Sequence, residues 1–196
     1  FFFSFENDLD FWIFFYMGCR IKKKMIRVFE NVLNTDDQAL MYEYGRQEQK
    51  RRDCGIVFNP DCKRLQYNVA VTHPSHRLVE RIIKNYTFAR GRIPCNSCFL
   101  YSKKGCCAQP LHFDYDPHQK VSKKEPLSAL IALEDGTRLN LNNGQIELNA
   151  GDMCIFDRFC AHGGAAYDRK SNLRFFTYLS TPEFPSPTNE TYLLHQ

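Results

Sequence analysis

Hydrophobic and polar positions follow two different periods along the chain. In the first half, apolar residues recur at helical spacing and predict helices over 21–33, 35–49 and 74–90. Asn34 stands before two acidic residues and is typical of a helix N-cap, and Pro74 suits the first position of the last helix. Two strands, over 55–59 and 65–72, are predicted between the second and third helices.

From Cys98 onward the pattern changes to short strands that are separated by turn residues. The predicted strands are 111–115, 127–133, 138–141, 145–148, 153–157 and 173–180. Asp135-Gly136 and Asn143-Gly144 tolerate positive φ, so we expect a hairpin turn at each pair.

Helices followed by evenly spaced strands indicate an α+β fold with a mainly β core, a small barrel with the N-terminal helices packed on one side. We expect a single domain with four parts. These are an apolar N-terminal segment (1–20), a helical and mixed support region (21–97), the β core (98–181) and a C-terminal tail (182–196).

Composition allows such a core and restricts the partners. The chain is 43% hydrophobic with 17 Phe, and its net charge is only +4. The most basic run, 46–52, mixes acidic and basic residues and is interpreted as a solvated helix end. There is thus no strong nucleic-acid signal.

Nine cysteines cannot all pair within the chain, and reduced thiols are typical of a cytoplasmic or nuclear protein. Cys95, Cys98, Cys106 and Cys107 leave a structural zinc site open as an alternative, although adjacent cysteines rarely ligate one ion.

Residues 1–20 carry an apolar run that is too short to span a bilayer, so no transmembrane span is predicted. Acidic residues precede this run and basic residues follow it, which is the reverse of a signal peptide. A buried strand and a membrane- or partner-contacting segment both remain open. Because the first residue is Phe, we expect the sequence to start inside a longer reading frame.

The strongest chemical signal is His112-Phe113-Asp114. Side chains two apart on a strand point to the same face, so His112 and Asp114 are predicted to enter one cavity. His162 is the best candidate for a third metal ligand. Arg174 follows it in the sequence, and the interval is long enough for a strand, a turn and a return strand. Two histidines and one carboxylate are the ligand set of non-haem Fe(II) oxygenases. Three further histidines, His73, His76 and His118, are interpreted as surface residues.

His112, Asp114, His162 and Arg174, in this order and in this strand context, resemble the pattern of the Fe(II)/2-oxoglutarate-dependent dioxygenase superfamily. The resemblance covers 98–181 and implies a double-stranded β-helix, a jelly-roll or cupin-like barrel. It also implies Fe(II), 2-oxoglutarate as co-substrate and O2, with oxidative decarboxylation to succinate and CO2 and hydroxylation or demethylation of a substrate.

The resemblance also assigns roles outside the metal ligands. Arg174 would bind the far carboxylate of 2-oxoglutarate, because a guanidinium pairs two carboxylate oxygens better than an ammonium does. Polar side chains at Tyr101, Gln109 and Asn140 would assist the co-substrate carboxylates. Arg174 in place of Lys departs from collagen-type prolyl hydroxylases, and Ser180 lacks the second Arg of alkylation-repair dioxygenases.

No motif identifies the substrate, which is either a small molecule or a macromolecular side chain. Two other functions stay open at this point. One is a cupin-like metalloprotein that uses no 2-oxoglutarate, although Asp157, Phe159 and Ala166 replace the residues that accompany the second cupin motif. The other is a non-catalytic barrel that serves as a binding module.

Overall fold

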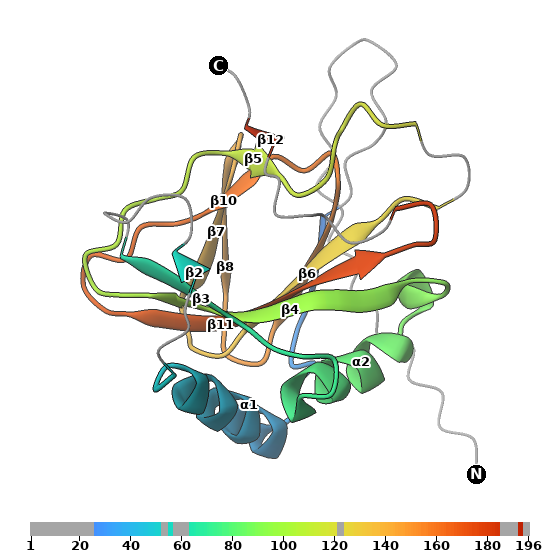
Figure 1. Cartoon of the computed structure of the whole chain (residues 1–196). Coiled ribbons are helices and arrows are strands. Elements are labelled where there is room, and N and C mark those ends of the chain that lie inside the picture. Colours follow the sequence, from blue (N-terminus) through green and yellow to red (C-terminus); the bar gives the residue numbers. More distant parts are fainter. Residues whose placement is uncertain (1–25, 52–54, 57–62, 121–123, 185–191, 194–196) are drawn as a thin grey trace.

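Two antiparallel β-sheets pack against each other in the computed structural model, which describes residues 26–51, 55–56, 63–120, 124–184 and 192–193 (Figure 1). Within these residues the larger sheet has seven strands, in the order β1 (Ile26–Phe29), β9 (Met153–Asp157), β6 (Leu127–Ala132), β11 (Asn172–Ser180), β4 (Ile93–Ser102), β3 (Arg64–Asn68) and β2 (Gly55–Ile56). The smaller sheet has five, in the order β12 (Tyr192–Leu193), β5 (His112–Phe113), β10 (His162–Gly164), β7 (Thr137–Leu141) and β8 (Gly144–Leu148).

Two helices, α1 (Thr35–Glu48) and α2 (Pro74–Lys84), cover the outer face of the larger sheet, and a short 3-10 turn, Thr87–Ala89, follows α2. The predicted fold class is confirmed: a β-rich core of two antiparallel sheets with helices on one side. The strands β1, β2 and β3 extend the larger sheet, so the support region and the β core share one sheet.

The core has two layers because successive residues of a strand point to opposite faces. On β11, Leu173, Phe175 and Leu179 belong to the cluster between the larger sheet and the helices. Phe176 and Tyr178 belong to the cluster between the two sheets. Arg174 has the same parity as Phe176, so it lies on the inner face, as its spacing predicted.

The two helix starts follow their sequence signals. The side chain of Asn34 accepts a hydrogen bond from the Asp37 backbone N–H at 2.8 Å, so this cap orients α1 as predicted. Pro74 opens α2, and Leu78, Val79 and Ile83 form its buried stripe. This helix ends at Lys84, whereas the prediction extended it to residue 90. The 3-10 turn Thr87–Ala89 lies in the rest of the predicted range.

The predicted helix over 21–33 is wrong. Its described part contains β1, which pairs with the edge of β9 in antiparallel register from Ile26–Phe156 to Phe29–Met153. A helix at this place would leave the backbone groups along the edge of β9 without the hydrogen bonds that β1 provides. Asn31, with φ of 52°, makes the turn after the strand and donates its backbone N–H to Asp152 Oδ1 at 3.0 Å.

One of the two predicted hairpins is also wrong. The Asn142-Asn143 turn joins the paired strands β7 and β8, as predicted. The Asp135-Gly136 turn instead carries the chain from β6 in the larger sheet to β7 in the smaller one. Gly136 does adopt the positive φ, 72°, that the sequence suggested. The residue types at this turn therefore predict its backbone conformation, but they do not determine which strands pair.

His76 is buried beneath the larger sheet, so its interpretation as a surface residue is wrong. Its Nδ1 lies 2.7 Å from Ser97 Oγ, which donates to Thr177 Oγ1 at 2.8 Å, and Thr177 Oγ1 donates to the Cys95 carbonyl at 3.2 Å. This chain of hydrogen bonds, the back-face network, connects α2 to β4 and β11.

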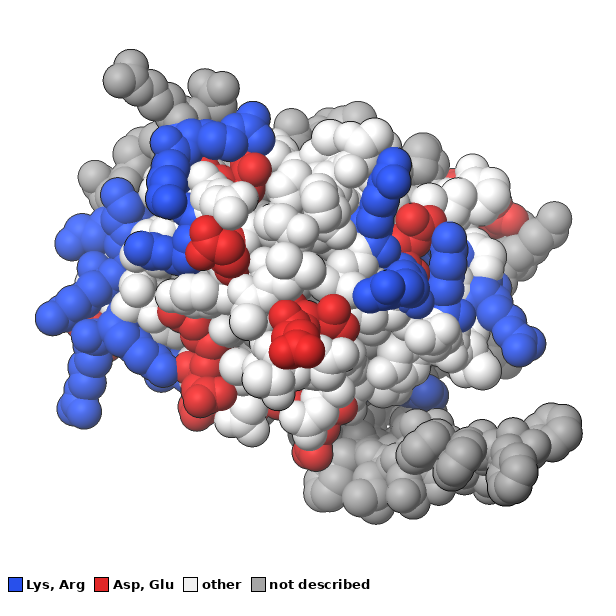
Figure 2. Space-filling view, turned by 90° about the horizontal axis from the view of Figure 1, so that it is seen from below, with Lys and Arg blue, Asp and Glu red and all other residues white. Residues whose placement is uncertain are grey.

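The outer surface around the helices carries charges of both signs. Figure 2 shows Lys and Arg gathered toward two opposite edges of this face, with Asp and Glu between them. Neither helix of the described residues has the length and apolar character needed to cross a membrane.

Gly45 lets α1 approach the larger sheet closely. A Cβ at this position would lie 2.7 Å from Leu173 Cδ2 and 2.9 Å from Phe99 Cδ1, both in the buried layer. We expect Gly45→Val to lower the free energy of unfolding by about 1–3 kcal/mol through overpacking, measured by urea denaturation. Leu40→Val on the exposed side of α1 has a similar β-branched cost without the clash, so it should change stability far less. Equal losses in the two variants would contradict this account.

Burial lowers the pKa of His76, which gives the back-face network a pH dependence. Between this lowered value and the ordinary histidine pKa of about 6.5, the unfolded chain binds more protons than the folded protein. Stability should therefore decrease as the pH falls through that window. His76→Asn, whose amide can keep the bond to Ser97, should lose this component of the pH dependence. Urea unfolding at several pH values measures it, and identical slopes for wild type and variant would exclude it.

Candidate metal centre

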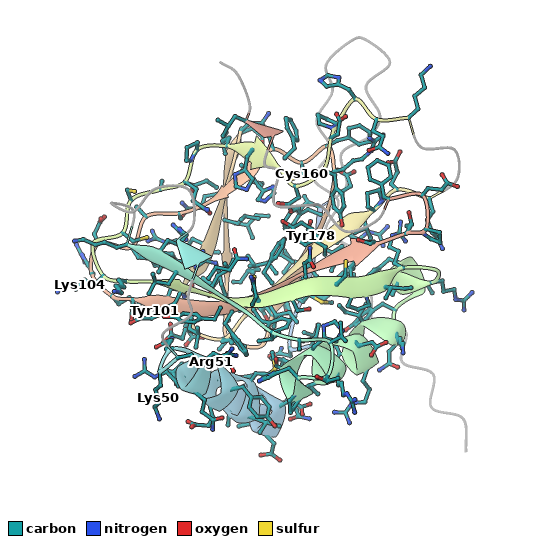
Figure 3. The ribbon with its side chains drawn as sticks, viewed as in Figure 1. Lys50, Arg51, Tyr101, Lys104, Cys160 and Tyr178 are labelled. Carbon is teal, nitrogen blue, oxygen red and sulfur yellow. The ribbon has the colours of Figure 1, made fainter. Side chains whose placement is uncertain are left out.

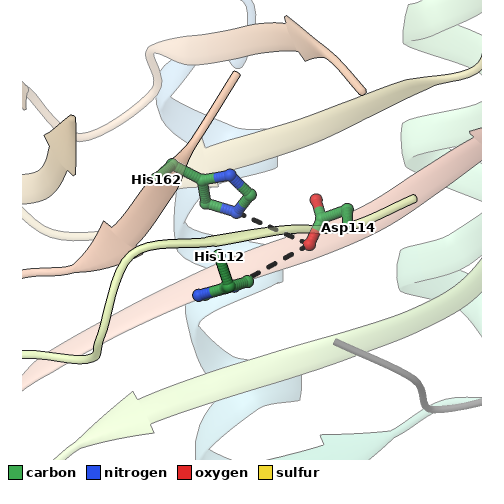
Figure 4. A group of neighbouring side chains, drawn as sticks. All are labelled: His112, Asp114 and His162. Atoms are coloured by element: carbon green, nitrogen blue, oxygen red, sulfur yellow. Dashed lines mark ion pairs between the residues drawn. The ribbon is translucent and has the colours of Figure 1, made fainter. Parts of the chain in front are cut away.

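Three buried side chains converge at one end of the space between the sheets. His112 and His162 are register partners on the neighbouring strands β5 and β10, and Asp114 follows β5 directly. One ligand atom from each residue lies within 4.8 Å of the others (Figure 4). Each residue is 5% exposed. The structure thus brings together the three residues that the sequence put forward as metal ligands.

Both imidazoles are oriented by backbone carbonyls. His112 Nδ1 lies 2.9 Å from the Pro110 carbonyl oxygen, and His162 Nδ1 lies 2.9 Å from that of Cys160. A carbonyl can only accept, so Nδ1 carries the proton in each ring. The Nε2 atoms then face Asp114, at 3.9 Å and 3.5 Å from its Oδ1. Both rings therefore direct Nε2, the nitrogen that can ligate a metal, at the same point.

The carboxylate is held from the opposite sheet. Ser128, on β6, donates its hydroxyl to Asp114 Oδ2 at 2.5 Å, which leaves Oδ1 directed at the two imidazoles. In the described residues, the ion-pair partners of Asp114 are these two imidazoles, with no Lys or Arg among them. A buried carboxylate in this position gains strongly from a cation.

The electrostatics of the triad differ between its members. Burial, together with His162, lowers the pKa of His112 to about 4, so this ring is neutral near pH 7. Burial also acts to lower the pKa of His162, but the adjacent Asp114 carboxylate outweighs it and raises the pKa overall. Burial acts to raise the pKa of Asp114, and the two imidazoles and the Ser128 hydroxyl lower it further than burial raises it. The carboxylate is thus ionised and ready to ligate.

The donor set fits a metal ion of the Fe(II) type. Two imidazole nitrogens and one carboxylate oxygen, all directed at one point, suit an ion that keeps its other coordination positions open. Among the described residues, this triad is the only group of three or more His, Cys, Asp or Glu side chains close enough to hold a metal. The four cysteines considered for zinc do not form such a group.

Arg174 lies on β11 and is 2% exposed. Its Nη1 donates to Ser102 Oγ at 2.9 Å and to Asn172 Oδ1 at 3.4 Å, both neutral acceptors. Burial, followed by the nearby guanidinium of Arg64, lowers the pKa of Arg174 to about 10, so the side chain stays charged near neutral pH. Burial raises the pKa of Cys98 to about 12, and Arg174 and Asp114 also act on it, so Cys98 lies within electrostatic reach of both.

The other predicted co-substrate residues are placed differently. Tyr101 packs with the cluster between the larger sheet and the helices, whereas Tyr178 packs with the cluster between the two sheets (Figure 3). Tyr101 and Ser102 are successive residues of β4, so they point to opposite faces. Asn140 alternates with the inward Leu139 and Leu141, and its Oδ1 accepts from Gln145 Nε2 at 2.7 Å. The structure brings neither residue to the triad.

Gln109 lies beside the strand that carries His162. Its Oε1 accepts from the Gly164 backbone N–H at 2.8 Å, and its own backbone N–H donates to the Gly164 carbonyl at 2.9 Å. Gln109 therefore supports β10, two residues beyond the metal ligand.

Sequence reasoning missed three polar residues of this cavity: Ser128, Ser102 and Arg64. Each is buried, with 1%, 0% and 1% exposure respectively. Ser128 and Ser102 are small residues within mainly apolar strands, and Arg64 immediately precedes a predicted strand. A serine that interrupts a buried strand is a weak signal, and nothing in the spacing of Arg64 indicated that it points inward.

No protein-family model matches the chain, and no curated protein matches it either. Solved structures do match. The α-ketoglutarate-dependent carbocyclase SnoK from nogalamycin biosynthesis has a TM-score of 0.64 at 13% identity, over 80% of this chain and 79% of that one. A Pseudomonas putida prolyl-4-hydroxylase has a TM-score of 0.62 at 13% identity, over 81% and 93%.

HygX from Streptomyces hygroscopicus, crystallised with nickel, 2-oxoglutarate and hygromycin B, has a TM-score of 0.57 at 14% identity, over 88% of this chain and 93% of that one. At these identities the likeness shows the fold. The chain therefore has the double-stranded β-helix fold of the 2-oxoglutarate-dependent oxygenases, and the resemblance predicted from sequence is confirmed at that level.

Ser128 offers a test of how the carboxylate is held. Ser128→Ala leaves Asp114 Oδ2 without this hydroxyl, so the carboxylate can rotate and its Oδ1 is no longer fixed toward the imidazoles. We expect divalent metal affinity to fall about 10- to 100-fold, measured by Mn(II) or Co(II) titration. Ser97→Ala removes a buried hydroxyl on the outer face of the same sheet and should leave metal affinity unchanged. Equal metal affinity in Ser128→Ala and wild type would show that this hydroxyl does not orient the ligand.

Proposed function

We propose that this protein is an Fe(II)- and 2-oxoglutarate-dependent oxygenase that hydroxylates or demethylates its substrate, with release of succinate and CO2. The observation that carries the proposal is the pairing of two features in one fold. His112, Asp114 and His162 direct three ligand atoms at one point, and Arg174 supplies a buried cation on the inner face of the facing sheet.

The hydrogen bonds of the three ligands support a role for each of them. His112 and His162 would each bind Fe(II) through Nε2, because their Nδ1 atoms are engaged by carbonyls. Asp114 would bind through Oδ1, because Ser128 occupies Oδ2. The iron, when bound, supplies the activation of O2 that drives the oxidation. Solved proteins of this fold contain Fe3+ or nickel with 2-oxoglutarate, which supports the same cofactors here.

Arg174 would bind the far carboxylate of the co-substrate. Its hydrogen-bond partners in the described residues are neutral, so a carboxylate would provide the charge that the surrounding residues do not. A guanidinium can form two parallel hydrogen bonds to a carboxylate, which fixes its direction as well as its position. With the 2-oxo acid end on the metal, the co-substrate would extend from the triad on the smaller sheet toward β11 of the larger one.

The substrate is proposed only as a class. Similar folds act on or contain a nogalamycin derivative, hygromycin B or a prolyl residue, so both small molecules and macromolecular side chains suit this scaffold. No disulfide joins any two of the six described cysteines, and we place the protein in a reducing compartment, cytoplasmic or nuclear.

Anaerobic titration with Fe(II), with and without 2-oxoglutarate, tests the proposal. We expect a visible metal-to-ligand charge-transfer band only when both are present. His162→Ala should lose metal binding and the band together. Arg174→Ala should keep the metal and weaken 2-oxoglutarate binding about tenfold or more, because a charge-assisted interaction is removed. Arg169→Ala, in the loop before β11, is the control arginine and should keep both.

The same titration separates the alternatives. Tight metal binding without the band, and with Arg174 dispensable, would favour a cupin-like metalloprotein that uses no 2-oxoglutarate. Failure of the folded wild-type protein to bind metal would refute both metal-dependent functions and leave a binding module.

A further inference from the structure

Arg64 is a second buried guanidinium next to Arg174. It begins β3, pairs in register with Ser102 on β4 and is 1% exposed. Its Nη1 donates to Ser102 Oγ at 2.6 Å, the same oxygen that accepts from Arg174 Nη1 at 2.9 Å. One hydroxyl oxygen thus receives hydrogen bonds from both cations, which places the two guanidinium groups side by side in the interior.

Arg64 also reaches the strand that carries His162. Its Nη2 donates to the carbonyl of Gly164, the last residue of that strand, at 3.4 Å, and to that of Ala165, the next residue, at 3.0 Å. The Cys107 carbonyl also accepts from it, at 3.2 Å. A Cβ on Gly164 would lie 2.6 Å from Arg64 Nη1, so the glycine leaves the space that the guanidinium occupies. Arg64 therefore stands between the end of β10 and Arg174 on β11.

Positive charge is concentrated around Arg174. Burial and then Arg64 lower the pKa of Arg174, and Tyr167, Cys106 and Cys98 act in the opposite direction. Two like charges in contact with one hydroxyl repel each other, and the repulsion is relieved when an anion binds to both. Arg64 also contributes, after burial and the other members of the triad, to the lowered pKa of His112, so its field extends to the metal centre.

We propose that Arg64 is a positioning residue for the co-substrate, which acts with Arg174 on the far carboxylate and makes the pocket selective for dicarboxylates over monocarboxylate 2-oxo acids. The proposal rests on the proposed function. Its physical basis is the position of Arg64 between β10 and Arg174 and the shared Ser102 hydroxyl. Arg174 would donate the two direct hydrogen bonds to the carboxylate. Arg64 adds a second positive charge and holds Ser102 in place.

The test compares two acids that chelate a metal in the same way. 2-Oxoglutarate has a second carboxylate, and 2-oxobutanoate has none, so the ratio of their Kd values on the Fe(II)-loaded protein reports on the far end of the pocket. Anaerobic calorimetry measures both values without turnover. Arg64→Gln keeps hydrogen-bond donors but removes the charge, whereas Arg64→Lys keeps the charge. Arg64→Met is a second neutral variant if the glutamine does not fold.

We expect the neutral variants to reduce the selectivity ratio at least about tenfold, mainly through 2-oxoglutarate, and the lysine variant to retain most of it. Arg138→Gln is the matched control, because Arg138 Nη2 donates to the Ala166 carbonyl in the same segment. It should leave the ratio unchanged. A ratio that is unchanged in the neutral variants, or an equal loss of both acids, would show that Arg64 only supports the fold and would overturn the proposal.

The two proposals fail in different ways. If wild type binds metal but shows no preference for 2-oxoglutarate, the proposed function is refuted and the role of Arg64 with it. If Arg174→Ala loses 2-oxoglutarate while Arg64→Gln retains full selectivity, only the role of Arg64 is refuted.

Discussion

The buried carboxylate of Asp114 is the constraint around which the cavity is organised. A charge in the interior is stable only with partners, and Asp114 receives them from both sheets: two imidazoles from the smaller sheet and the Ser128 hydroxyl from the larger one. The imidazoles in turn are fixed by carbonyls two residues before them. The packing of the two sheets therefore determines the ligand geometry, and Phe156 of the cluster between the sheets packs against His162.

A second charged region complements the first. Arg174 and Arg64 place positive charge near Ser102, whereas Asp114 places negative charge at the triad. A divalent cation on the triad would give both regions positive charge, which supports the proposed binding of a ligand with an acid group at each end.

Much of this site could be predicted from sequence, because period-two spacing on a strand fixes which side chains share a face. His112, Asp114 and Arg174 followed from that parity, and α1 and α2 from their caps and apolar stripes. The same rule explains why the structure does not bring two other predicted residues to the triad. Tyr101 and Asn140 have the opposite parity to the inward Ser102 and Leu139, which only the register of the sheets reveals. The first strand and the 135–136 turn depended on long-range pairing with β9 and on the change of sheet, which local patterns do not encode.

A bulge in β4 links the outer face of the larger sheet, toward the helices, to its inner face. The register with β11 shifts between Phe176 and Tyr178, and Asn96, with φ of 46°, takes up the extra residue of β4. Ser97 then faces the helices and joins Thr177 in the back-face network, while Cys98 faces the cavity. Thr177 and Arg174 lie on one strand with opposite parity. Hydrogen bonds that hold Thr177 on the outer face thereby limit rotation of β11 and keep Arg174 directed into the cavity.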